Sequence, residues 1–263
     1  MTVAERRATT WSMKKATCYG HTVTIYVKKT AERYGLELRR GSTKQWGTLI
    51  GDVEGEDATE FVKKKVRKYD TFFDRLFHPK LSRHHTALLL RICLKLAPTF
   101  WARTVPPSKA QAGLQEFDER VKEVVIKKLL QVETKPERYP EALFKINTPV
   151  YLGGLGLREM STICNAAYLA CWLETLRHIW NIFGEEMYFP NHRIYDQVVV
   201  AFRQTQQQLP RIGPGEGPIP DTLDECMDTF IENAPSKLQR EMVKKIEGHM
   251  VRSYSLQVAH DCV

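Results

Sequence analysis

The residues of this sequence that are best suited to chemistry are positively charged, and they gather in its middle third. Residues 61–132 carry 16 Lys and Arg against 6 Asp and Glu, whereas residues 133–263 carry 13 against 17. A charge excess confined to one region is typical of a surface that meets an anionic partner, and nucleic acid is the first candidate. The side chains that we expect to contact an RNA or DNA backbone are Lys63, Lys64, Lys65, Arg67, Lys68, Arg91, Lys95 and Arg103.

A simpler interpretation of the same cations remains open. Residues 63–68 would then form only the solvated side of an amphipathic helix, and Arg91 and Lys95 would pair with acids from the C-terminal third. Binding measurements on substituted chains separate the two interpretations.

A glycine-rich run at Gly153, Gly154 and Gly156 is a second feature that could hold phosphate, because glycines expose backbone N–H groups ahead of a helix. Its spacing does not match G-x-G-x-x-G, and no Gly-Lys-Ser/Thr follows. We therefore interpret the run as a tight turn that packs the following helix closely.

Histidines and cysteines form no recognisable metal pattern. His78, His84 and His85 lie near one another in sequence, but no His or Cys pair has zinc spacing. Cys164 and Cys171, seven residues apart, are more typical of small core residues. The sequence also lacks a Gly-x-Ser-x-Gly nucleophile motif. It therefore predicts no metal, no cofactor and no visible active site.

The central elements that position the cations lie between residues 81 and 131. Residues 86–97 are apolar at almost every position except Arg91 and Lys95, so we expect a buried helix with one cationic face. Prolines then interrupt the chain, and an amphipathic helix follows from Leu114 to Val125.

Two acid-before-base pairs mark the outer side of that second helix. Asp118–Lys122 and Glu123–Lys127 are each spaced by four residues, which mildly stabilises a solvated helix.

The flanking elements follow from propensity and turn signals. Before the centre, we expect two short strands over Thr17–Lys28, with a turn at Gly20-His21, and a third strand over Trp46–Ile50. We expect helices over Ala31–Leu38 and Thr59–Phe77. After the centre, long helices are predicted over Met160–Phe183, from Asn191 to about Gln207, and from Ser236 through Leu256, with a shorter one over Asp221–Ile231.

Composition limits the class of protein. The 43% apolar and 27% charged content is that of a soluble globular protein, and no apolar run approaches the roughly 20 residues that span a bilayer. The N-terminus has no signal-peptide core, and the six cysteines include no C-x-x-C pair. We expect an intracellular protein, nuclear or cytoplasmic, with reduced thiols and no membrane partner.

The order of motifs resembles the downstream part of a reverse transcriptase of the non-LTR retrotransposon type. The fragments that carry the resemblance are CYGHTVTIY (18–26), RYGLELRRGSTK (33–44), GTLIGD (47–52), LLLRICL (88–94), TVPPS (104–108), FDERV (117–121) and TPVYLGGLGLRE (148–159). Each fragment is weak, but seven in the family's order are fairly specific. The resemblance implies a mainly α fold with a small β element: a partial polymerase palm of short antiparallel strands, a helical thumb that tracks template and primer, and a helical connection region.

The sequence departs from this family at its catalytic motif. Tyr19-Gly20-His21-Thr22 stands where the family has Tyr-x-Asp-Asp, whose carboxylates hold Mg²⁺ for nucleotidyl transfer. His21 and Thr22 carry no negative charge at neutral pH, so Mg²⁺ is expected only in an intact family member. The resemblance thus implies a pseudoenzyme derived from an RNA-directed DNA polymerase, with the fingers and the first palm strand expected before Met1. The sequence ends without a turn or a polar tail, so we also expect its C-terminal helices to be truncated.

The resemblance, together with composition and helix signals, divides the chain into regions. We expect a partial palm over residues 1–58, a basic thumb-like region over 59–140, the glycine turn with its helical connection over 141–208, a Pro/Gly linker over 209–220 and C-terminal helices over 221–263. An alternative from another class is a helical protein–protein interaction or scaffold module, with a partner-binding face around Trp172 and Trp180.

Overall fold

The computed structural model describes residues 17–19, 33, 37–39, 42–45, 47–51, 56–94, 97–131, 139–183, 193–208, 225 and 238–261. The chain divides into two compact units, Met1–Ala58 and Thr59–Val263. The fold is mainly helical, as predicted, and the only described strands lie in the first unit. No described helix is long and apolar enough to cross a membrane.

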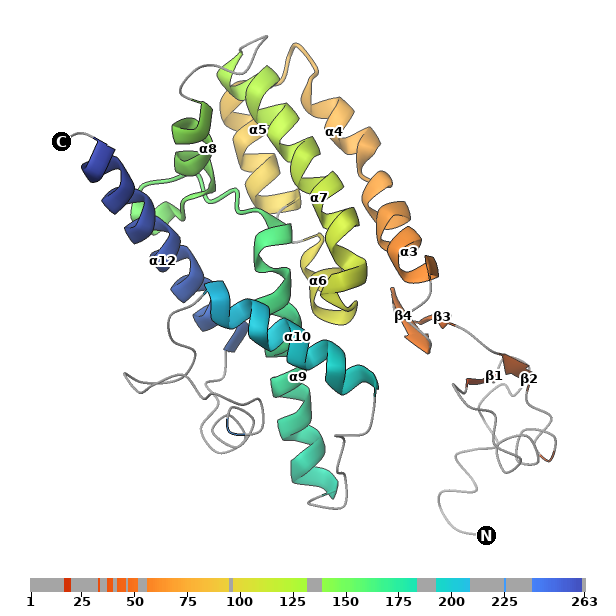
Figure 1. The fold of residues 1–263 in the computed structure, drawn as a ribbon. Helices are drawn as coiled ribbons and strands as arrows, with labels where there is room; N and C mark the ends of the chain where they lie inside the picture. Colours follow the sequence, from red (N-terminus) through yellow and green to blue (C-terminus); the bar gives the residue numbers. More distant parts are fainter. Residues whose placement is uncertain are drawn as a thin grey trace. The chain divides into compact units, whose positions relative to one another are not determined.

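The first unit contains two short strand pairs (Figure 1). Strands β3 (Ser42–Gln45) and β4 (Thr48–Gly51) are antiparallel, and Gly47 between them has a φ of 86°, which favours glycine. Strands β1 (Thr17–Tyr19) and β2 (Glu37–Arg39) instead pair in parallel, so the expectation of only antiparallel strands is wrong. The predicted turn at Gly20-His21 lies outside the described residues.

Two boundaries in this unit differ from prediction. Leu38, expected to end a helix, lies in β2, because pairing with Cys18 overrides the weak local helical preference. The strand expected over Trp46–Ile50 begins two residues later, since Gly47 supplies the hairpin turn.

Helix α3 (Glu56–Arg67) leads from the end of the first unit into the second, where α4 (Asp70–Leu76) follows it. These replace the single helix expected over Thr59–Phe77. The interruption lies at Tyr69, whose ring packs 6.1 Å from that of Trp101 and 6.4 Å from that of Phe117. Val62, Val66, Phe73 and Leu76 form the buried stripe of the two helices.

Next come α5 (Arg83–Leu89), which continues as the π-helix η2 (Leu90–Leu94), and then α6 (Thr99–Thr104). Ser82 caps α5 by accepting a hydrogen bond from the His85 N–H. The expectation of a buried helix that reaches water only through its cationic face is wrong, because apolar residues outside that face are exposed as well. Thr86, Leu90 and Leu94 form one buried face, while Ile92 is 63% exposed. A single apolar stripe four residues apart suffices to hold this surface helix.

Helix α7 (Pro107–Val124) continues as the π-helix η3 (Val125–Leu130), which ends at Gln131 in the left-handed region with a φ of 56°. Pro107 suits the first turn because its missing N–H would have no helical partner there. Helix α8 (Tyr139–Asn147) and a 3-10 turn, η4 (Val150–Leu152), follow.

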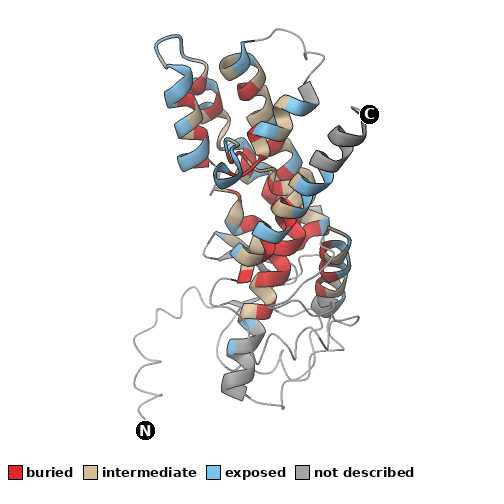
Figure 2. Cartoon of the chain, turned by 90° about the vertical axis from the view of Figure 1, so that its left-hand side faces the viewer, coloured by how far each residue is buried: buried red, intermediate tan, exposed pale blue. Residues whose placement is uncertain are grey.

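The centre of the second unit is α9 (Met160–Phe183), which has the bounds predicted from its apolar pattern. Helices α6, α7, α10 (Arg193–Gln208) and α12 (Leu238–Asp261) pack around it (Figure 1). Buried residues line the helix faces that meet in this interior (Figure 2). They include Leu169, Phe202 and Ile246 from α9, α10 and α12. The predicted helices after Asn191 and Ser236 therefore form, each ending one to several residues later than expected.

Candidate nucleic-acid interface

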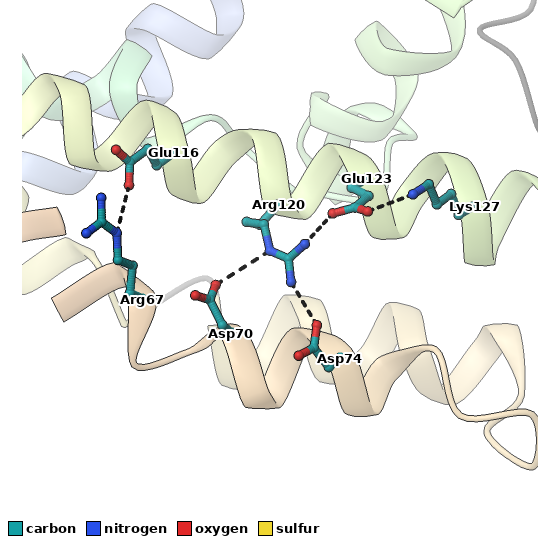
Figure 3. A network of polar contacts seen from close by, with 7 residues as sticks. All are labelled: Arg67, Asp70, Asp74, Glu116, Arg120, Glu123 and Lys127. Carbon is teal, nitrogen blue, oxygen red and sulfur yellow. Dashed lines mark hydrogen bonds and ion pairs between the residues drawn. The ribbon is translucent and has the colours of Figure 1, made fainter. Parts of the chain in front are cut away.

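A row of ion pairs joins α7 to α3 and α4 (Figure 3). Cations that belong to this row are paired with carboxylates and are therefore less available to a partner. At one end of the row, Glu116 of α7 lies 3.4 Å from Lys63 Nζ and 3.8 Å from Arg67 Nε. Arg67 also lies 3.6 Å from Glu60. Two of the predicted nucleic-acid contacts are therefore already neutralised by carboxylates of the same unit.

At the other end, Arg120 of α7 binds three carboxylates. It contacts Asp74 at 2.9 Å, Asp70 at 3.6 Å and Glu123 at 2.5 Å (Figure 3). Glu123 in turn accepts from Lys127 at 2.8 Å, so this predicted pair is confirmed. The arrangement clamps α4 against α7, where Phe73 also packs on Phe117 with ring centroids 5.5 Å apart.

The second predicted pair, Asp118–Lys122, is wrong. The Asp118 carboxylate is buried and accepts hydrogen bonds from the backbone N–H groups of Met160 and Ser161 and from the Ser161 hydroxyl. It thereby caps the N-terminus of α9 from another helix. Lys122 instead contacts Glu119 at 3.0 Å and Glu159 at 3.2 Å.

These contacts account for every acidic residue between positions 61 and 132. The six are Asp70, Asp74, Glu116, Asp118, Glu119 and Glu123. The cations paired with them are Lys63, Arg67, Arg120, Lys122 and Lys127. Of the 15 cations of this region that the structure describes, the other ten have no carboxylate of this segment within ion-pair distance.

Among the predicted nucleic-acid contacts, Lys64 and Lys68 are the best candidates. Lys64 lies in α3, and Lys68 follows directly after that helix. Both are exposed and neither has an ion-pair partner within the described part of the chain. Arg91 is also exposed and unpaired among these residues. Lys65 is half-buried with its Nζ 5.2 Å from the centre of the Phe61 ring, a cation–π contact that leaves its charge intact.

The remaining predicted contacts are placed differently. Arg103 is bound to Glu174 of α9 at 2.9 Å and helps hold α6 on α9. Lys95 and the degenerate catalytic positions His21 and Thr22 lie outside the described residues. Sequence reasoning also missed Arg75 and Lys80, which are exposed and without an ion-pair partner in the described ranges. Both stand apart from the other cations in sequence, so they gave no periodic signal.

The glycine run is a tight turn, as interpreted. Gly153 and Gly156 have φ values of 88° and 69°, and the N–H groups of residues 153 to 157 all donate to carbonyls between Lys145 and Val150. A Cβ on Gly154 would lie 2.0 Å from the Thr148 carbonyl oxygen. Because these N–H groups have partners, and Asp118 occupies the N-terminus of α9, neither feature is open to a phosphate.

The described residues of the second unit include three cysteines, of which Cys164 is buried and Cys93 is exposed. Cys93, Cys164 and Cys171 are free, and burial raises the pKa of the Cys164 thiol to about 11, which disfavours the nucleophilic thiolate. Within the described ranges, no group of three or more His, Cys, Asp or Glu is placed to hold a metal ion.

The tryptophans expected to form a partner-binding face are only partly placed. Trp172 is half-buried against Tyr168 and the core around α9. The side chain of Trp180 lies outside the described part of the chain. A partner-binding face around these two rings therefore stays a prediction.

Comparison with known proteins adds no family. No family model, no curated protein and no solved structure matches the chain. The arrangement of charges is therefore the strongest functional observation for this protein.

Proposed function

We propose that this protein binds the phosphate backbone of RNA or DNA through the unpaired cations of its second unit. The observation that carries the proposal is that all six acids between residues 61 and 132 are engaged inside the unit, while Lys64, Lys68 and Arg91 extend into solvent. An uncompensated group of cations raises the local concentration of a polyanion and releases its counterions on binding.

The order of the sequence motifs supports a more specific form of the same proposal. In a reverse transcriptase of the non-LTR retrotransposon type, the thumb helices follow the template–primer backbone, and residues 59–140 are the counterpart here. Tyr19-Gly20-His21-Thr22 lacks the carboxylates that such an enzyme needs. We therefore propose binding without nucleotidyl transfer, so a primed template with Mg²⁺ or Mn²⁺ should show no extension above a protein-free control.

Binding is tested by affinity measurements with labelled oligonucleotides of unrelated sequence. The triple variant Lys64→Ala/Lys68→Ala/Arg91→Ala should bind about tenfold or more weakly at moderate salt, because three phosphate contacts are lost. The loss should be similar for every sequence, since phosphate contacts carry no base information. Lys244→Ala is the matched control, because this exposed lysine of α12 pairs with Glu241 at 3.3 Å.

Two results would argue against the proposal. One is wild-type affinity in the triple variant with an unchanged circular dichroism spectrum. The other is a loss of log affinity in Lys244→Ala that equals, per charge removed, the loss in the triple variant, which would mean that net charge alone governs binding.

A further inference from the structure

A groove of about 560 Å³ opens between α7, α9 and α10. Five glutamines and one asparagine dominate its lining: Gln111, Gln115, Asn165, Gln197, Gln204 and Gln208. Ser108, Ser161 and Thr162 contribute hydroxyls, and the other three lining residues, Pro107, Val200 and Ala201, are apolar. Among the described residues, the lining contains no ionisable side chain and no aromatic ring. Its volume lies in the range of specific ligand sites, about 300–1,000 Å³.

Two of these amides form hydrogen bonds between the helices that line the groove. Ser108 of α7 donates to Gln197 Oε1 of α10 at 3.1 Å, and the Gln208 amide donates to the Thr162 carbonyl of α9 at 3.1 Å. These bonds tie the three helices together across the groove. The remaining oxygen of Gln208 is buried and accepts no hydrogen bond from the described residues.

Other amides are left for a ligand. Asn165 is only 8% exposed, lines the groove, and has no side-chain hydrogen bond among the described residues. Its amide atoms keep contact with solvent in the groove, where they can bind a ligand. Gln115 and Gln204 are exposed on opposite helices of the groove and are likewise unpaired within the described part of the chain.

The composition of the lining identifies the class of ligand. Its neutral amides and hydroxyls offer no charge to a phosphate backbone and no stacking platform of the kind on which unpaired bases are usually bound. Amide side chains carry both donors and acceptors, which match the N–H and C=O groups of an extended polypeptide. We propose that this groove binds an extended, uncharged polar segment of a partner polypeptide.

Peptide selection on the full chain tests the proposal. A phage-displayed library of random dodecapeptides is the probe, and enriched peptides are then synthesised and titrated by fluorescence anisotropy. We expect peptides rich in Asn, Gln, Ser and Thr, with affinities that change little between about 0.1 M and about 0.5 M NaCl, because no charges pair. The variant Gln115→Ala/Gln204→Ala should bind them about tenfold more weakly, since two hydrogen-bonding groups are lost.

Gln207→Ala is the matched control, because Gln207 is an exposed glutamine of α10 that does not line the groove. It should bind as the wild type does. Failure to enrich any peptide, or equal affinity of the selected peptides for the wild type and the double variant, would overturn the proposal. So would loss of oligonucleotide affinity in the double variant with peptide affinity unchanged, which would assign the groove to nucleic acid.

Discussion

The carboxylate of Asp118 accepts both the backbone N–H of Ser161, at 2.9 Å, and its hydroxyl, at 2.6 Å, although 43 residues separate the two positions. A third hydrogen bond comes from the Met160 N–H at 2.9 Å. One buried side chain of α7 thus satisfies the first N–H groups of α9, around which the other helices of the unit pack.

Removing this contact should destabilise the second unit. Asp118→Ala leaves two backbone N–H groups and a hydroxyl without their acceptor, and we expect the free energy of unfolding to fall by about 2–4 kcal/mol. Urea unfolding followed by circular dichroism measures the change. Glu119→Ala is the control, because Glu119 is exposed and contacts Lys122 at the surface, so its loss should cost less than about 1 kcal/mol. Equal effects of both substitutions would contradict the capping role.

The same carboxylate should make stability depend on pH. Burial raises the pKa of Asp118 from 3.8 to about 6, although its hydrogen bonds from Ser161 and Met160 oppose the shift. Between these values the folded chain binds a proton that the unfolded chain releases. The contribution of this proton to the free energy of unfolding is therefore fully present below about pH 4 and is lost as the pH rises through about 6. The total change in the free energy of unfolding is about 3 kcal/mol.

This dependence is measured by comparing the wild type with Asp118→Asn, which cannot titrate. The free energy of unfolding of the wild type, relative to the variant, should be higher at about pH 5 than at about pH 7.5. A difference that grows with rising pH would show that the carboxylate has a depressed pKa instead.

The glycine turn gives a prediction about backbone geometry. At Gly154 an alanine Cβ would lie 2.0 Å from one carbonyl oxygen and 2.5 Å from another, so Gly154→Ala should cost about 3 kcal/mol or more or prevent folding. A Cβ added at Gly248 in α12 would meet nothing within 4 Å, and Gly248→Ala should stabilise the protein by about 0.5–1 kcal/mol. Thermal unfolding of both variants checks the contrast, and a tolerated alanine at 154 would refute this close packing.

Periodicity predicted the long helices well, because their apolar stripes record local packing. The bounds of α9 follow from the spacing of apolar residues within that helix, and the Glu123–Lys127 pair follows from a four-residue spacing within another. Asp118 looked like a surface partner of Lys122, since its true partners at 160 and 161 are distant in sequence. The pairing of Glu116 with cations of α3 was hidden for the same reason. The sequence shows where the cations are. The packing of α7 on α3 shows which cations of α3 are paired with a carboxylate and which are not.

The role of Glu116 offers a gain-of-function test. Glu116→Gln removes the carboxylate that neutralises Lys63 and Arg67, so nucleic-acid affinity should increase roughly two- to fivefold at low salt. Glu241→Gln changes the net charge equally and, among the described residues, frees Lys244 in α12 instead. Oligonucleotide titrations of both variants compare the two sites. A similar gain in each would show that position does not matter.

The most direct measurement of nucleic-acid binding is the salt dependence of affinity. For the wild type, log Kd should rise linearly with log salt concentration, by about 0.7–0.9 per phosphate contacted. In Lys64→Ala/Lys68→Ala/Arg91→Ala the slope should be shallower by about 2–3, whereas Lys244→Ala should keep the wild-type slope. An unchanged slope in a folded triple variant would contradict a backbone interface at these three cations.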